Sequence, residues 1–176
     1  ETLGKCEIRS PIKLSTVYGE NQANYVKDDS FVINAVNVFD ASKPVALDST
    51  NLMQKAGPRE YIFFDPKDVK AGICTCGGLC PGLNDVIRAI VRSLWNRYGV
   101  RDIRGFQFGY KGFFEEEGYP TIALDPENVD EIHKIGGSFL GTSRGGGKRV
   151  TDIVDTIQRM GINMMFIIGG DGTQRG

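Results

Sequence analysis

The chain has 176 residues, of which 40% are hydrophobic and 24% charged, and its formal net charge is −1. This composition is typical of a globular protein, and it excludes a collagen, a disordered charged tail and a bulk nucleic-acid binder. Glycine is the anomaly, because 23 glycines make up about 13% of the chain against a usual share of about 7%.

The glycines divide the chain into two parts, since three of them precede residue 71 and 20 follow it. We therefore predict an N-terminal extension over residues 1–70 and a glycine-rich domain over residues 71–176. The longest stretch without a charge, residues 71–84, is too short to span a bilayer, so we expect no membrane helix. We also see no signal peptide, which fits a cytosolic protein or one whose targeting signal has been removed. We expect the four cysteines to be free thiols.

The N-terminal extension carries few signals of regular structure. A mostly apolar run over residues 31–39 predicts one strand. Asp65 followed by Pro66 is typical of a helix start, and it predicts a short helical turn just before the second part.

The second part begins with a strand over residues 71–74 and a glycine loop. Apolar residues at helical spacing then predict an amphipathic helix over residues 83–98 that ends near Gly99. Residues 103–108 predict the next strand. Asp125 and Pro126 predict the start of a helix that continues through Ile135.

The remaining pattern continues the alternation of strands and helices. We predict a short strand over residues 138–141, a helix over 150–160 and a buried strand over 162–168 that leads into a glycine loop. This order indicates an α/β fold with a Rossmann-like, mostly parallel sheet flanked by helices. Ligands of such sheets bind at the carboxyl ends of the strands, where the glycine clusters lie.

Three glycine loops lie at or beside these strand ends, at residues 77–82, 141–147 and 169–173. Adjacent glycines let backbone N–H groups approach a phosphate, whereas a single loop of this kind is more often a tight turn. Lys148 is followed by Arg149, so the P-loop pattern fails, and Arg175 replaces the last glycine of a dinucleotide fingerprint. The three loops together therefore predict a polyphosphate site of another kind.

Two charged residues within these loops have a use in phosphoryl transfer. Asp171 could hold Mg²⁺ that bridges phosphate oxygens, and Arg144 could neutralise charge on a transferring phosphoryl group. The alternative interpretations are a turn-forming carboxylate for Asp171 and a solvated surface charge for Arg144.

The loops, taken together, resemble three successive signatures of the phosphofructokinase family. These are Gly-Gly-Leu-Cys-Pro-Gly-Leu-Asn at residues 77–84, Gly-Thr-Ser-Arg-Gly-Gly at 141–146 and Gly-Gly-Asp-Gly-Thr at 169–173. The resemblance covers residues 61–176. The first signature, with the long N-terminal extension, is similar to the plant- and protist-type ATP-dependent branch.

The resemblance implies ATP-dependent phosphorylation of fructose 6-phosphate at its 1-hydroxyl, with Mg²⁺ as cofactor. It implies a catalytic role for Arg144 in stabilising phosphoryl charge and a magnesium-binding role for Asp171. The ATP-binding residues that it implies are Gly77, Tyr110, Arg144, Gly145, Gly170, Asp171, Gly172 and Thr173.

Gly172 bears on the phosphoryl donor, because pyrophosphate-dependent relatives have an aspartate at this position, where it would obstruct the α-phosphate of ATP. We therefore predict ATP, with pyrophosphate as the alternative. Arg88 and Arg92 match helix positions that bind phosphorylated effectors in the short bacterial type, while a solvated helix face is an equal alternative.

The resemblance also implies a homotetramer or homodimer in the cytosol, with a plastid or a glycosome as alternative compartments. The aspartate base and the sugar-phosphate residues of the family lie in a segment beyond Gly176. We therefore expect a partial phosphofructokinase fold, and no kinase activity from these 176 residues alone.

Three rival functions stay open. NAD kinases and lipid kinases share the Gly-Gly-Asp-Gly-Thr loop, but they are not expected to carry the first signature. Cys74, Cys76 and Cys80 could form a metal or redox module, although their spacing lacks a fourth ligand nearby, and His133 is more typical of a surface or core residue. A regulatory nucleotide-binding subunit without catalysis is the third.

Overall fold

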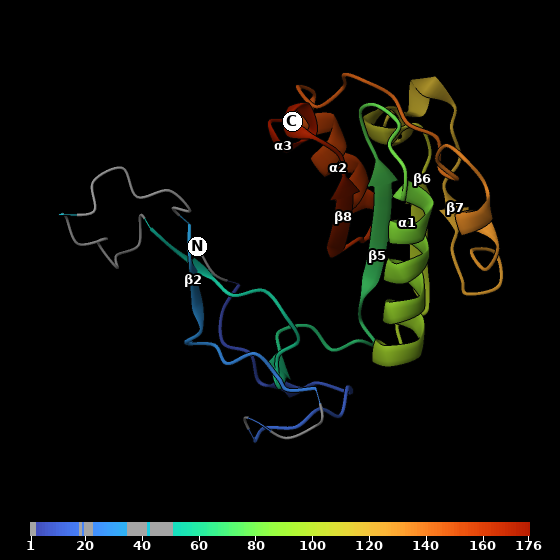
Figure 1. Cartoon of the computed structure of the whole chain (residues 1–176). Coiled ribbons are helices and arrows are strands. Elements are labelled where there is room, and N and C mark those ends of the chain that lie inside the picture. Colours follow the sequence, from blue (N-terminus) through green and yellow to red (C-terminus); the bar gives the residue numbers. More distant parts are fainter. Residues whose placement is uncertain (1–2, 18, 20–22, 35–41, 43–50) are drawn as a thin grey trace. The chain divides into compact units, whose positions relative to one another are not determined.

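The computed structural model describes residues 3–17, 19, 23–34, 42 and 51–176. The chain forms two compact units, Glu1–Phe63 and Phe64–Gly176, and each is described here by itself (Figure 1). The division into an N-terminal extension over residues 1–70 and a glycine-rich domain over residues 71–176 stays a prediction.

The first unit contains two pairs of short antiparallel strands. β1 (Ile8–Arg9) pairs with β4 (Tyr61–Ile62), and β2 (Phe31–Ile33) pairs with β3 (Leu52–Gln54). β2 coincides with the start of the strand predicted over residues 31–39, and residues 35–39 lie outside the described part of the chain.

The second unit is built on a four-stranded sheet in the order β7-β6-β5-β8 (Figure 1). β5 (Lys70–Thr75) lies between β6 (Asp102–Phe106) and β8 (Met164–Ile168) and is parallel to both, while β7 (Ile122–Ala123) runs antiparallel to β6. Because β5 is central, its residues from Ala71 onward are buried. The prediction of an α/β fold with a mostly parallel sheet is confirmed.

Three α-helices accompany this sheet. α1 (Leu83–Arg92) continues as a π-helical segment, η1 (Ser93–Tyr98), and ends at Gly99, whose φ of 80° is left-handed. α2 (Val150–Met160) was predicted with the same bounds, and α3 (Asp171–Gln174) follows β8.

Three short 3-10 helices complete the second unit: η2 (Gly109–Phe113), η3 (Glu115–Glu117) and η4 (Ile132–Lys134). Within the described residues, the helices are too short or too polar to cross a membrane.

The core consists of two clusters, one on each face of the sheet. Ala71 and Ile73 of β5 pack in the first cluster with Ile87 and Val91 of α1. Cys74 and Cys76 pack in the second cluster with Ile153 of α2. Since successive side chains of a strand point to opposite faces, α1 and α2 cover opposite sides of β5. The sheet is thus flanked by helices, as predicted.

The predicted helix from Asp125 through Ile135 is wrong. The chain forms turns here, and only η4 is helical. The Asp125 carboxylate accepts hydrogen bonds from the backbone N–H groups of Glu127 and Asn128, at 2.9 and 2.8 Å, and the Asn128 amide donates to the Ala123 carbonyl at 2.7 Å. The two bonds to Asp125 cap a first turn, as at a helix start. The Asn128 side chain, however, bonds back to the Ala123 carbonyl, and the segment continues as turns.

Four smaller predictions also differ from the structure. Residues 138–141 form a turn instead of a strand, and the Gly141 N–H donates a hydrogen bond to the Ser138 carbonyl at 2.9 Å. Residues 65–68 form a turn without a helix, and the strand predicted to reach residue 108 ends at Phe106. β8 is only half-buried, because it lies at the edge of the sheet described here.

A substitution at Gly112 would test how tightly η2 packs against the preceding backbone. A Cβ at this position would lie 2.4 Å from the carbonyl oxygen and 2.9 Å from the nitrogen of Gln107, both in the backbone. We expect Gly112→Ala to lower the free energy of unfolding of the full-length protein by about 2–3 kcal/mol, because backbone must move. Gly136→Ala is the matched control: its Cβ meets no atom within 4 Å, so its melting temperature should stay close to the wild type. Equal melting of both variants in a thermal scan would contradict the packing argument.

Candidate functional site

The loops that follow β5 and β8 line a cavity of about 360 Å³ together with two other segments. The lining residues come from four places in the sequence: Cys76, Gly77, Gly78, Tyr110, Ser143, Arg144, Gly145, Gly147, Gly170, Gly172 and Thr173. All three predicted glycine loops therefore contribute to one cavity at the carboxyl ends of parallel strands.

Hydrogen bonds between the loops hold the wall of this cavity. The Cys76 N–H donates to the Ile168 carbonyl at 2.8 Å, which ties the end of β5 to β8. The Gly77 N–H donates to the Ser143 carbonyl at 2.8 Å, and the Thr142 hydroxyl donates to the Gly77 carbonyl at 2.9 Å. Gly77 has a φ of +91°, a conformation that favours glycine. The first and second loops thus form one connected surface.

The third loop is fixed by Thr173 and Tyr110. Thr173 is buried, and its side chain lies against Gly169, where an added Cβ would meet the Thr173 hydroxyl oxygen at 2.2 Å. The Tyr110 hydroxyl donates to the Thr173 carbonyl at 3.0 Å. A side chain at residue 169 is therefore excluded by packing, whereas Gly170 and Gly172 have open space around them.

The two charged residues of the predicted site differ in their surroundings. Arg144 lines the cavity, is exposed, and makes no hydrogen bond or ion pair within the part of the chain that the structure describes. Asp171 does not line the cavity, although Gly170 and Gly172 on either side of it do. Its carboxylate is 92% exposed and pairs with Arg175 at 3.2 Å. An exposed guanidinium and open glycines give the cavity wall groups that suit an anion.

The structure therefore brings together seven of the eight predicted site residues: Gly77, Tyr110, Arg144, Gly145, Gly170, Gly172 and Thr173. That they bind a nucleotide stays a prediction. Four further residues, Cys76, Gly78, Ser143 and Gly147, also line the cavity. Gly78, Ser143 and Gly147 belong to the glycine loops, so their place in these loops is the signal that could have identified them. Cys76 directly precedes the first loop, and its adjacency to Gly77 is the corresponding signal.

Cys76 and Tyr110 have shifted pKa values for connected reasons. The Cys76 sulfur lies 3.9 Å from the Cys74 sulfur, and this hydrogen bond, together with one from the Tyr110 backbone, lowers the pKa of Cys76 despite its burial. The same thiol contact, with burial, raises the pKa of Cys74. Burial and then the two nearby thiols raise the pKa of Tyr110, so its hydroxyl stays a proton donor to Thr173.

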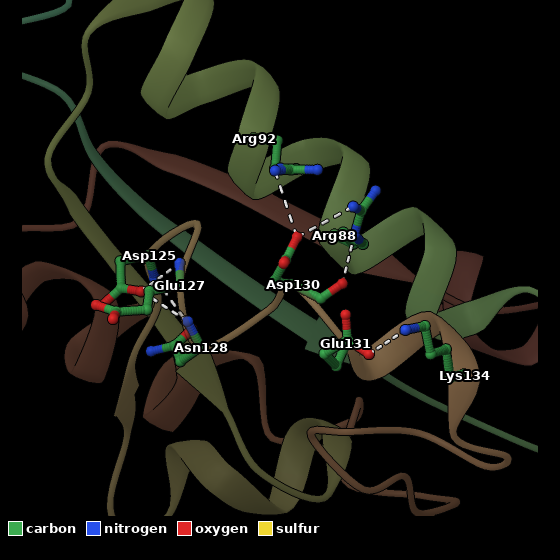
Figure 2. A network of polar contacts seen from close by, with 8 residues as sticks. All are labelled: Arg88, Arg92, Asp125, Glu127, Asn128, Asp130, Glu131 and Lys134. Carbon is green, nitrogen blue, oxygen red and sulfur yellow. Dashed lines mark hydrogen bonds and ion pairs between the residues drawn. The ribbon is translucent and has the colours of Figure 1, made fainter.

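Arg88 and Arg92 on α1 do not line this cavity. Figure 2 shows both guanidinium groups directed at Asp130, whose carboxylate lies 3.2 Å from Arg88 and 3.3 Å from Arg92. Arg88 also donates from Nε to the Asp130 carbonyl at 3.0 Å. The two arginines are thus paired within the chain and are not a freely solvated helix face. Whether they bind an effector is untested.

We expect Asp130→Ala to lower the free energy of unfolding by about 1 kcal/mol at low salt, because it leaves two neighbouring guanidinium groups without their shared carboxylate. Asp130→Asn keeps the shape and a hydrogen-bond acceptor, so the difference between the two variants isolates packing and hydrogen bonding from charge. Thermal melts of the full-length protein at two salt concentrations would measure this, and the loss should shrink at high salt. A deficit independent of salt would contradict the electrostatic explanation.

Among the residues that the structure describes, histidine, cysteine, aspartate and glutamate side chains do not gather in groups of three or more that could hold a metal ion. The four cysteines are free thiols, with Cys74 and Cys76 buried and Cys6 and Cys80 exposed. Cys74, Cys76 and Cys80 are therefore not such a group within the described part of the chain.

Sequence comparisons identify relatives that match between three quarters and all of the chain. The ATP-dependent 6-phosphofructokinase of Borreliella burgdorferi is 49% identical over 176 residues, which are all of this chain and 38% of that protein. ATP-dependent 6-phosphofructokinase 1 of Arabidopsis thaliana is 45% identical over 167 residues, 95% of this chain and 33% of that protein. The ATP-dependent 6-phosphofructokinase of Trypanosoma cruzi is 45% identical over 133 residues, 76% of this chain and 27% of that protein.

The chain thus spans about a third of the length of these curated relatives. The sequence model of the family described as Phosphofructokinase matches residues 70–176, which contain the sheet, α1, α2 and all three loops of the cavity. With this match over more than half of its length, the chain belongs to the phosphofructokinase family.

Proposed function

We propose that the full-length protein is an ATP-dependent 6-phosphofructokinase, which transfers the γ-phosphoryl group of ATP to the 1-hydroxyl of fructose 6-phosphate. The observation that carries the proposal is the convergence of three glycine loops, far apart in sequence, on one cavity at the strand ends. Membership of the family and the printed function of the relatives support the same reaction.

Gly172 supports ATP as the phosphoryl donor. It lines the cavity, has no side chain and has no neighbouring atom within 4 Å of an added Cβ, so space is open on this wall. A carboxylate at residue 172 would place negative charge on the wall that is proposed to bind phosphates, and the two would repel each other. The pyrophosphate alternative lacks support from the relatives, which are named ATP-dependent.

Different residues of the chain would bind the phosphates, stabilise the developing charge and hold the loops in place. The glycine loops would present backbone N–H groups to the phosphates, as adjacent glycines at strand ends do. Arg144 would neutralise charge that develops on the transferring group, and it is available for this role because it has no hydrogen-bond or ion-pair partner among the residues that the structure describes. Tyr110 would hold the third loop in place through its bond to Thr173. Positioning of this kind is the main contribution of protein to phosphoryl transfer.

The residues present are compatible with a magnesium ion bound together with the nucleotide. Mg²⁺ in such sites takes one or two carboxylates plus phosphate oxygens, and Asp171 offers one carboxylate that is almost fully exposed. Bound there, the ion would supply neutralisation of phosphate charge. Asp171 would have to exchange its surface pair with Arg175 for this role.

The experiment is a donor and acceptor test with the full-length protein. Formation of fructose 1,6-bisphosphate from ATP, and not from pyrophosphate, is the expected result. Phosphorylation of NAD without phosphorylation of fructose 6-phosphate would replace the proposal with the NAD kinase alternative. Nucleotide binding without any phosphorylation would favour a regulatory subunit.

We also propose a homodimer or homotetramer in the cytosol, which the family resemblance suggests. Two relatives from Arabidopsis thaliana are named chloroplastic, so a plastid is the alternative compartment that the comparisons support. Light scattering of the full-length protein and fractionation of cells would test these two proposals.

A further inference from the structure

Cys74 and Cys76 form a pair of thiols at the end of β5, behind the wall of the nucleotide cavity. Their sulfur atoms lie 3.9 Å apart, and both side chains are buried in the cluster that contains Tyr110 and Phe113. Only Cys76 lines the cavity. One residue of the pair thus borders the cavity while its neighbour is enclosed by the core, an arrangement suited to an attacking and a resolving cysteine.

The packing around Cys76 selects it as the attacking thiol. Its sulfur accepts a hydrogen bond from the Tyr110 backbone in addition to the contact with Cys74, and both bonds favour its thiolate form. Cys74 has no exposed surface, and its thiol lies within hydrogen-bonding distance of the Cys76 sulfur. Gly109 leaves room for the sulfur, because a Cβ there would lie 3.1 Å from it with a left-handed φ of +63°.

We propose that Cys76 is an oxidation site for hydroperoxides, and that Cys74 converts the product into a Cys74–Cys76 disulfide that switches off nucleotide binding. This proposal goes beyond phosphoryl transfer. Its effect on nucleotide binding rests on the proposed function, whereas the thiol chemistry does not.

The chemistry needs only the peroxide as a co-reactant. The Cys76 thiolate attacks one oxygen of hydrogen peroxide, so an S–O bond forms, the O–O bond breaks, and the hydroxide that leaves becomes water with a proton from solvent. The Cys74 sulfur then attacks the Cys76 sulfur, forming the S–S bond while the S–O bond breaks. The hydroxide leaves with the Cys74 proton as a second water. Two thiols are oxidised and one peroxide is reduced, and a dithiol reductant reverses the change.

Disulfide formation would distort the cavity, because the sulfurs must approach each other by roughly 2 Å more. The Cys76 N–H donates to the Ile168 carbonyl. The N–H of the next residue, Gly77, donates to Ser143, and its carbonyl accepts a hydrogen bond from Thr142. Movement of Cys76 toward Cys74 therefore pulls on the bonds that connect all three loops. We expect loss of ATP binding in the oxidised protein and its recovery after reduction.

The test treats the full-length protein with hydrogen peroxide, maps its cysteines by mass spectrometry and measures ATP binding before and after. The wild type should show a Cys74–Cys76 disulfide and a reversible loss of ATP binding, and saturating ATP should slow both. Cys74→Ser should stop at a sulfenic acid on Cys76, which dimedone traps. Cys76→Ser should form no disulfide with Cys74, and peroxide should not change its ATP binding relative to its own untreated sample.

Cys80→Ser is the matched control, since Cys80 is an exposed thiol close in sequence that does not line the cavity. It should respond to peroxide as the wild type does. A disulfide that contains Cys80, or equal sensitivity of Cys76→Ser and wild type, would overturn the proposal. Mapping of the wild type decides the thiol chemistry without any variant. A mapped Cys74–Cys76 disulfide in a protein that does not bind ATP would refute the proposed function and the switch, but not the oxidation site.

Discussion

Gly172→Asp in the full-length protein should reduce kcat/KM for ATP by about a hundredfold, the equivalent of roughly 3 kcal/mol, without a comparable loss of stability. The glycine lines the cavity and has open space around it, so the new side chain can be accommodated by the fold itself. The loss would arise because a carboxylate on this wall repels the phosphates that we propose the loops bind. Steady-state kinetics with ATP and fructose 6-phosphate would measure it.

Gly172→Asn and Gly172→Ala are the matched controls for this change. Asparagine has the shape of aspartate without its charge, and the alanine Cβ meets no atom within 4 Å. We expect Ala to remain close to wild type and Asn to lose far less activity than Asp. Equal losses for Asn and Asp would show that bulk, and not charge, excludes the donor. Unchanged ATP kinetics in the Asp variant would remove the argument that Gly172 selects ATP.

The parts of the fold that could be predicted depend on local patterns. The strands around β5, the helices α1 and α2 and their glycine stops at Gly99 and Gly161 follow from apolar periodicity and from the left-handed conformation of these glycines. The joint position of the first and third loops was also predictable, because they follow β5 and β8, and the carboxyl ends of parallel strands meet at one edge of a sheet. The second loop follows a turn, and it joins the first through the bonds that link Gly77 with Thr142 and Ser143.

What could not be predicted depends on contacts between distant residues. Asp125 and Pro126 look like a helix start, but Asn128 binds the carbonyl of Ala123, and the chain turns. Arg88 and Arg92 look like a solvated face, but the same turns deliver Asp130 to both of them, as Figure 2 shows. A helix propensity or a charge pattern contains no information about such partners, which only the folded chain supplies.

The same limit applies inside the cavity. A Cys-x-Cys spacing on a strand predicts that both thiols share one face. It does not predict that Gly109 and the Tyr110 backbone enclose the second sulfur, nor that this cysteine reaches the cavity wall. The glycine loops therefore predict where the cavity lies, but the sequence does not show which residues pack beside these loops.

Arg144→Gln should lower kcat of the full-length enzyme by about 10²–10³-fold while leaving its melting temperature nearly unchanged. The guanidinium lines the cavity and, within the described residues, has no hydrogen bond or ion pair, so the fold does not depend on it. Charge that develops during phosphoryl transfer would be left without this cation. The loss should therefore appear mainly in kcat, because an interaction made in the transition state is removed.

Arg149→Gln is the control with the same change of charge in the same segment. Arg149 does not line the cavity, and its guanidinium pairs with Glu116 at 2.5 Å and Asp152 at 2.6 Å. This variant should therefore lose some stability and keep most of its kcat, the reverse of Arg144→Gln. If the two variants lose kcat equally, the effect reflects net positive charge near the site. If Arg144→Gln raises KM for ATP at constant kcat, Arg144 binds the nucleotide but does not stabilise the transferring group.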